Sequence, residues 1–201
     1  IGFILNPYAG IGGKAGLKGS DNYKKIEKLL LEGCERTAPK RAESCMSKIA
    51  DLTASLVAGD KGLVGEKNFS ILSAPGDMGE ALLEKLKIPC DVVLCPKAHT
   101  SSAEDTKLCA QIMKEQGVDL LVFCGGDGTA RDICEAVGTD VTVLGIPAGV
   151  KMYSACYACN PYQAGEMLAG WLEGKEMSYE MREVLDIEEK DLDSRNVSPK
   201  L

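Results

Sequence analysis

The sequence lacks several features that mark whole classes of protein. No apolar run approaches the roughly 20 residues that cross a bilayer, and the start shows no charged segment followed by an apolar one, as a secretory signal would. Lys and Arg number 23 against 30 Asp and Glu, which gives a formal net charge of −7. Nucleic-acid binding without sequence preference and attachment to anionic lipid both need a basic surface. We therefore expect a cytoplasmic protein with neither nucleic acid nor a membrane among its partners.

Histidine is also scarce, and this bears on the interpretation of the cysteines. The chain has nine cysteines but a single histidine, His99. Cys156 and Cys159 form a CxxC pair, yet a zinc site needs two further ligands, and His99 lies far away in the sequence. The number of cysteines is odd and most lie in apolar segments, such as the run from Cys90 to Cys95. This pattern predicts buried, reduced thiols in a cytosolic protein and no directly held metal.

The apolar residues that are present predict an α/β fold. Hydrophobic residues make up 45% of the chain and charged residues 26%, and 201 residues suit one large domain or one domain with a remnant. Short, mostly apolar runs predict five buried strands, over 2–5, 69–72, 91–95, 119–124 and 141–146. Helical patterns predict helices over 21–32, 42–56, 78–86, from about 102 to 115, 130–137 and 161–174. Apolar strands that alternate with helices indicate an open parallel sheet with helices on both faces.

Capping residues and a change after Gly174 refine the helix starts and the domain boundary. Ser101 with Glu104 fits a capping box, and Asn160 fits an N-cap before the last helix. After Gly174 the alternation of strands and helices stops, since 181–187 resembles another strand and a polar tail follows. We therefore expect an N-terminal α/β nucleotide-binding domain over 1–175. Residues 176–201 are expected to begin a C-terminal β domain that is mostly absent from this chain.

One short string carries the clearest chemical signal. Gly125–Thr129, Gly-Gly-Asp-Gly-Thr, follows the most hydrophobic strand and precedes a helix. Glycines let the backbone approach a phosphate chain, while the N–H groups and the positive end of the next helix attract its oxygens. Asp127 would be repelled by phosphate unless Mg²⁺ lies between them, or unless it faces an acceptor hydroxyl as a general base. A tight turn without chemistry is the alternative, but the junction between strand and helix favours function.

A second glycine-rich loop follows the first predicted strand. Gly10–Ala15 matches the loose GxGxxG/A pattern of dinucleotide sites, but Ala rather than Ser or Thr follows Lys14, which excludes a Walker A loop. Further glycines prevent a helix from starting at once. A loop that covers phosphates therefore fits better, with Lys14 and Lys18 as charge partners, and a plain flexible connection is the alternative.

Taken together, these strings resemble one kinase superfamily. Gly125–Thr129 is the signature of NAD kinases, diacylglycerol kinases and sphingosine kinases, and Asn6-Pro7 with the glycines after it resembles their first-strand loop. Thr100 resembles the threonine that approaches the nucleotide phosphates in the lipid kinases, and Gly145–Met152 resembles the second glycine motif. The chain is most similar to the bacterial and archaeal ATP-NAD kinase family, including members linked to acetoin utilization.

This resemblance implies a fold, a reaction and a set of residues. The fold would be a Rossmann-like α/β domain followed by an all-β domain that supplies most of the acceptor site. The reaction would be phosphorylation of a hydroxyl of NAD by ATP with Mg²⁺, giving NADP, with Asp127 as the catalytic base. We expect nucleotides and small molecules as partners, and a homo-oligomer. The implied nucleotide-binding residues are Asn6, Pro7, Gly10, Gly12, Gly13, Thr100, Gly125, Gly126, Gly128, Thr129, Gly149 and Lys151.

Other functions stay open on the sequence alone. NAD kinases use an Asn-Glu pair for the acceptor ribose, and this sequence has no convincing match, so another hydroxyl acceptor (acetoin-derived, a polyol or a lipid) would fit the same chemistry. The donor is either ATP or polyphosphate. A non-catalytic nucleotide-binding protein is a further alternative. A Rossmann dehydrogenase fits less well, because no acidic residue sits cleanly on a second strand to hold a ribose.

Overall fold

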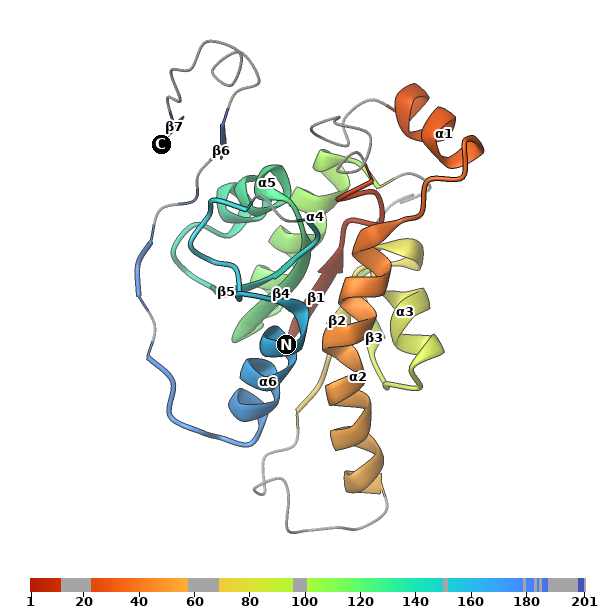
Figure 1. The fold of residues 1–201 in the computed structure, drawn as a ribbon. Helices are drawn as coiled ribbons and strands as arrows, with labels where there is room; N and C mark the ends of the chain where they lie inside the picture. Colours follow the sequence, from red (N-terminus) through yellow and green to blue (C-terminus); the bar gives the residue numbers. More distant parts are fainter. Residues whose placement is uncertain are drawn as a thin grey trace.

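A five-stranded parallel sheet forms the centre of the protein (Figure 1). The computed structural model describes residues 1–11, 23–57, 69–95, 101–149, 152–178, 180–182, 184, 186–187 and 199–200. The strands are β1 (Gly2–Leu5), β2 (Leu72–Ser73), β3 (Asp91–Val92), β4 (Leu120–Gly125) and β5 (Thr142–Pro147). They lie in the order β3-β2-β1-β4-β5, and every neighbouring pair is parallel.

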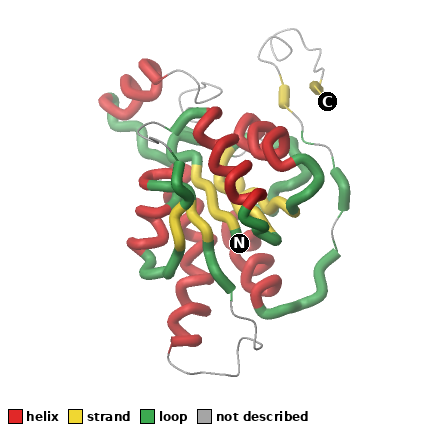
Figure 2. Tube along the Cα trace, turned by 180° about the vertical axis from the view of Figure 1, so that it is seen from behind, coloured by secondary structure: helices red, strands yellow, loops and turns green. Residues whose placement is uncertain are grey.

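Helices cover both faces of this sheet, as its apolar strands require. One face packs against α2 (Thr37–Val57), α3 (Glu80–Lys85) and α6 (Pro161–Leu172), and the other against α4 (Ala103–Glu115) and α5 (Asp127–Val137) (Figures 1 and 2). Successive side chains of a strand point to opposite faces. Thus Val122 joins the core under α2 and α6, while Phe123 joins the core under α4 and α5. The Rossmann-like α/β fold is confirmed.

Two parts lie outside this layered body. The helix α1 (Tyr23–Leu31) packs in a small cluster of its own, in which Ile11, Ile26 and Leu29 are buried, and it stands apart from the sheet in Figure 1. Beyond α6, the short strands β6 (Asp186–Ile187) and β7 (Pro199–Lys200) form an antiparallel pair. Among the described helices, none combines the length and apolar character needed to cross a membrane.

The strand predictions were wrong mainly at their ends. The second strand was expected over 69–72 but covers Leu72–Ser73, because these are the residues that align with Gly2 and Phe3 of β1. The third keeps only Asp91–Val92 of 91–95, the two residues aligned with β2. Of the described residues in the segment 181–187, only Asp186–Ile187 form a strand, β6, opposite Pro199 and Lys200.

Several helix starts also differ from the sequence expectation: α2 begins at Thr37 rather than at 42, and α3 begins at Glu80 rather than at 78. The capping box is Ser102 with Asp105, not Ser101 with Glu104: Ser102 Oγ accepts from Asp105 N (3.1 Å) and Asp105 Oδ2 accepts from Ser102 N (3.0 Å). Both pairs have the spacing of a capping box, so the sequence alone does not distinguish them. Helix α5 starts at Asp127 rather than near 130, since the Gly126 carbonyl accepts a hydrogen bond from the Ala130 N–H (3.0 Å). Asp127 therefore lies in the first turn of a helix.

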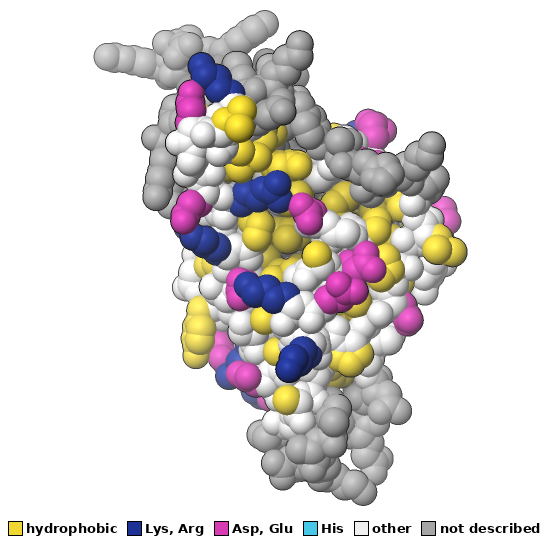
Figure 3. Space-filling model, turned by 90° about the vertical axis from the view of Figure 1, so that its right-hand side faces the viewer, with side chains coloured by type: hydrophobic (Ala, Val, Ile, Leu, Met, Phe, Trp, Pro, Cys, Tyr) yellow, Lys and Arg dark blue, Asp and Glu magenta, His cyan; other side chains and the backbone are white. Residues whose placement is uncertain are grey.

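Charged side chains of both signs alternate on the face that carries α2 and α3 (Figure 3). Arg36 pairs with Asp77 at 2.9 Å, and Lys85 pairs with Glu43 at 2.7 Å. Exposed pairs of this kind contribute about 0–1 kcal/mol each. This face therefore carries interspersed charges rather than a stripe of one sign.

The cysteines are free thiols, and several are deeply buried. Cys45, Cys109 and Cys124 have no exposed surface. Burial raises the pKa of Cys45, Cys109 and Cys156 to about 12, and it also raises the pKa of Cys124. Because the thiolate is the reactive form, these cysteines should be chemically inert in the folded protein.

We expect iodoacetamide at pH 8 to modify Cys159 first, since it is exposed, and to reach Cys45 and Cys109 only after unfolding. Peptide mass spectrometry of samples quenched at successive times gives the order of labelling. The same experiment in guanidinium is the control, and there all cysteines should react at similar rates. Labelling of Cys45 before Cys159 in the folded protein would contradict the burial described above.

Candidate functional site

The order of the strands places a topological switch point between β1 and β4. From β1 the chain builds β2 and β3 on one side, and then crosses to build β4 and β5 on the other side. The loops that follow β1 and β4 therefore leave the sheet in opposite directions, and ligands of open α/β sheets bind at such a point. Asn6 follows β1 and Gly126 follows β4, so the two strongest sequence candidates meet here.

Asn6 joins the first loop to the Gly-Gly-Asp-Gly-Thr string. Its backbone N–H donates to the Cys124 carbonyl (2.9 Å), and its Nδ2 donates to Thr129 Oγ1 (3.0 Å). Its Oδ1 accepts from the Tyr8 N–H (3.1 Å), which shapes the turn that follows. Thr129 is 5% exposed and Pro7 is buried, so both belong to the wall of the site rather than to its surface.

The loop after β5 completes the same wall. The Ala148 N–H donates to the Gly125 carbonyl (3.1 Å), and Gly10 lies so close that an added Cβ would be 2.3 Å from the Ala148 oxygen. From α2, Arg41 Nη1 donates to the carbonyls of Pro147 (3.1 Å) and Gly149 (3.2 Å). The loops after β1, β4 and β5 are thus joined directly to one another.

The three glycines of the string serve different purposes. At Gly125 an added Cβ would be 2.4 Å from Thr129 Cβ, so packing alone requires a glycine there. At Gly126 and Gly128 an added Cβ would meet no atom within 4 Å, and neither residue has a positive φ. Neither packing nor backbone conformation demands glycine at these two positions. The open space over them is what a closely approaching ligand would need.

The start of α5 is suited to an anion. Its N-cap residue is Gly126, which offers no side chain, whereas Ser102 caps α4 and Asn160 caps α6 by accepting from the Gln163 N–H (2.8 Å). The first N–H groups of a helix have no acceptor within the helix and lie at its positive end. The phosphates of a nucleotide fit this combination of free donors and open space.

Asp127 is tied to the loop after β5. Its carboxylate accepts from the Tyr153 N–H (3.2 Å to Oδ1 and 3.0 Å to Oδ2), from the Ser154 N–H (3.0 Å) and from the Ser154 hydroxyl (2.6 Å). Ser154 is 5% exposed. This contact joins the helix that carries the string to the loop that carries the second glycine motif.

A family model of the ATP-NAD kinase N-terminal domain matches residues 1–176, which include all five strands of the main sheet and α6. The chain belongs to the ATP-NAD kinase family. No curated protein and no solved structure gives a significant match. In this ATP-NAD kinase domain, the Gly-Gly-Asp-Gly-Thr string therefore lies at the topological switch point of the sheet, with the other two loops bonded to it.

The structure brings together most, but not all, of the residues expected from the sequence. Asn6, Gly10, Gly149 and the Gly125–Thr129 string lie in the three joined loops. Six expected residues lie outside the described part of the kinase domain: Gly12, Gly13, Lys14, Lys18, Thr100 and Lys151. Sequence reasoning missed Arg41 and Ser154, because a helix arginine and a loop serine carry no local signal of such distant partners.

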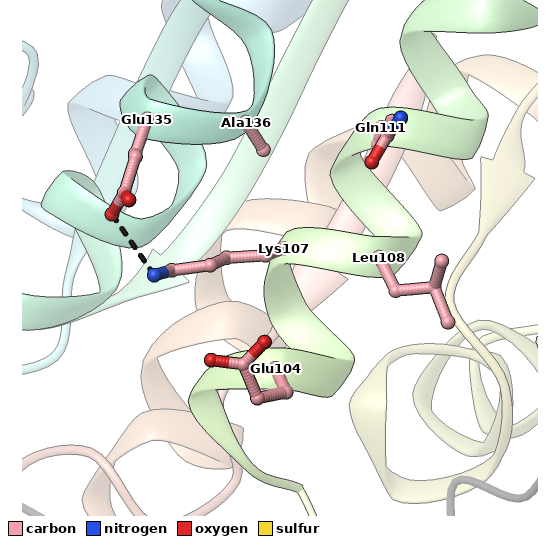
Figure 4. A pocket seen from close by; sticks show the side chains of 6 residues that line it. All are labelled: Glu104, Lys107, Leu108, Gln111, Glu135 and Ala136. Carbon is pink, nitrogen blue, oxygen red and sulfur yellow. Dashed lines mark ion pairs between the residues drawn. The ribbon is translucent and has the colours of Figure 1, made fainter.

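A surface pocket lies elsewhere on the kinase domain, between α4 and α5 (Figure 4). It encloses about 420 Å³ and is lined by helix residues, namely Glu104, Lys107, Leu108, Gln111, Glu135 and Ala136. An ion pair between Lys107 and Glu135 (2.9 Å) crosses it, and it contains none of the expected site residues. Within the described ranges, no three His, Cys, Asp or Glu side chains gather as a metal site.

Proposed function

We propose that this protein transfers the γ-phosphoryl group of ATP to a hydroxyl group of NAD and so produces NADP. The observation that carries the proposal is the start of α5, which has no side-chain cap and has open space at Gly126 and Gly128. Membership of the ATP-NAD kinase family supports the same reaction.

In the proposed mechanism, the backbone N–H groups at the start of α5 bind the phosphates, and Asp127 acts as the general base. Asp127 takes the proton of the acceptor hydroxyl while that oxygen attacks the γ-phosphorus, and the bond to the bridging oxygen of ADP breaks. Asp127 is the one carboxylate in the strings 6–11, 125–129 and 147–154. Mg²⁺, when bound with ATP, neutralises charge on the phosphates, and Asp127 is the carboxylate in these loops that would approach it.

The Gly128→Ala substitution tests the phosphate site. Alanine is a better helix former than glycine by about 0.5–1 kcal/mol, so the melting temperature should stay the same or rise. The added methyl group occupies the space left for phosphate, so ATP affinity should fall at least about tenfold. In wild type, ATP at 100 times its Kd should stabilise the fold by about 2.7 kcal/mol, and a thermal-shift titration measures how much of this the variant loses.

Gly126→Ala is the companion to that variant, because it also adds a methyl group in open space. Circular dichroism should show that both variants keep the wild-type helix content. If ATP stabilises wild type and both variants equally, the string is a structural turn and does not bind phosphate.

Another acceptor is the second candidate, since the sequence lacks a convincing Asn-Glu pair for a ribose. Full-length protein incubated with labelled ATP, Mg²⁺ and a panel of acceptors (NAD, acetoin, glycerol and diacylglycerol) tests this directly, with polyphosphate as an alternative donor. We expect label in NADP. Label in a different product would replace NAD in the proposal, and transfer to none of them would overturn the kinase reaction.

A further inference from the structure

The two oxygens of the Asp127 carboxylate are held unequally. Oδ1 accepts from the Tyr153 N–H (3.2 Å), the Ser154 N–H (3.0 Å) and the Ser154 hydroxyl (2.6 Å). Oδ2 accepts from the Tyr153 N–H alone (3.0 Å), as far as the described residues show. A carboxylate oxygen offers about two lone-pair positions. Oδ1 is therefore fully used by the protein, whereas Oδ2 keeps room for one more partner.

Ser154 makes the shortest of these contacts. At 2.6 Å its hydroxyl lies in the range of a hydrogen bond between a hydroxyl and a charged carboxylate, which is stronger than a bond between neutral groups. Its side chain is buried, so water is poorly placed to replace it. Ser154 also donates its backbone N–H to the same oxygen, and so holds Oδ1 from two positions.

We propose that Ser154 is a positioning residue for the catalytic base. A carboxylate that turns about its last side-chain torsion presents either oxygen to a ligand, because that torsion has a broad, two-fold preference. The Ser154 contacts remove this freedom and assign the proton-accepting role to Oδ2. This inference rests on the proposed function, in which Asp127 is the base.

The contact has a second effect on the geometry of the site. Asp127 lies at the start of α5, and Ser154 lies in the loop after β5, just beyond the second glycine motif. The base therefore moves together with this loop rather than with α5 alone. Holding reacting groups in one fixed geometry is a large part of what an enzyme contributes to phosphoryl transfer.

Four variants of the full-length protein test the proposal: Ser154→Ala, Ser154→Thr, Asp127→Asn and the double variant Ser154→Ala/Asp127→Asn. We expect Ser154→Ala to lower kcat about 10-fold to 100-fold, with the KM for ATP within about twofold of wild type. Threonine keeps the hydroxyl, so Ser154→Thr should recover most of the loss. In the Asp127→Asn background, Ser154→Ala should change kcat less than about twofold, because the group it positions is already gone.

Ser73→Ala is the matched control. Ser73, on β2, is also buried, and its hydroxyl donates to the backbone carbonyl of Ala74 (3.0 Å). The Ser73→Ala variant should be less stable than wild type, and its kcat should stay within about twofold of the wild-type value. If Ser154→Ala fails to fold, Ser154→Cys takes its place, since a thiol has similar size but is a weak donor, and the same fall in kcat is expected.

The possible failures can be told apart. If wild type is active and Ser154→Ala has the wild-type kcat, the inference is wrong. It is also wrong if the reduction of kcat in the double variant equals the product of the reductions in the two single variants, because Ser154 then does not act through Asp127. If wild type transfers phosphate to no acceptor, the proposed function itself fails, and the positioning role falls with it.

Discussion

Asp127→Asn in the full-length kinase is expected to lower turnover by about 10²–10⁴-fold, the usual contribution of a general base. Asparagine has nearly the same shape but cannot take up the proton of the acceptor hydroxyl. ATP affinity should change only a few fold, because the N–H groups at the start of α5 and the open space at Gly126 and Gly128 remain. Steady-state rates and an ATP thermal-shift titration on the same variant measure both quantities.

Two other roles of Asp127 give different results for this variant. If the carboxylate only organises Mg²⁺, the rate and the Mg²⁺ concentration required should change together. If it is only a structural residue, the melting temperature should fall while the folded fraction keeps nearly normal activity. The asparagine amide would also face backbone N–H donors at Tyr153, so some loss of stability is expected in every case. Ser154→Ala measures that loss separately, since it weakens the contact without removing the base.

Gly10→Ala is expected to lower the free energy of unfolding by about 2–5 kcal/mol, more than any other substitution proposed for this protein. Gly10 has φ +78°, a conformation that costs an L-residue about 1–2 kcal/mol, and its Cβ would lie 2.3 Å from the Ala148 oxygen. That contact is with backbone, so the loops after β1 and β5 must separate, at a further cost of about 1–3 kcal/mol. Urea unfolding followed by circular dichroism measures the change.

Gly33→Ala is the matched control, because Gly33 has φ +83° but no atom within 4 Å of an added Cβ. It should carry only the conformational cost, about 1–2 kcal/mol. The difference between the two variants isolates the contact between Gly10 and Ala148. Equal losses would mean that the two loops are not held together at this point.

The loops of the site could be predicted from the sequence more readily than the contacts within it. Strand β4 and the string after it were predicted because an apolar run followed by Gly-Gly-Asp-Gly-Thr is a local signal. Local signals do not contain the order β3-β2-β1-β4-β5, which decides that the loops after β1 and β4 lie side by side.

Long-range hydrogen bonds account for most of what the sequence could not show. Arg41 reaches Pro147, 106 residues away, and Asn6 reaches Thr129, 123 residues away. Ser154 lies two residues beyond the string that resembles the second glycine motif, and nothing in its neighbours indicates a bond to Asp127, 27 residues earlier. Such pairings follow from the tertiary fold, as do the ends of β2, which are set by its alignment with β1.

The small cluster under α1 gives this protein two levels of stability. A helix of nine residues is marginal by itself, and α1 is held by a cluster in which only Ile11, Ile26 and Leu29 are buried among the described residues. Local unfolding of α1 would therefore disrupt this cluster while the cores on both faces of the sheet stay packed. The cluster shares Tyr8 and Ile11 with the loop after β1. Amide hydrogens of α1 should thus exchange through low-energy openings beside the loop after β1, while those of β4 exchange only when the whole domain unfolds.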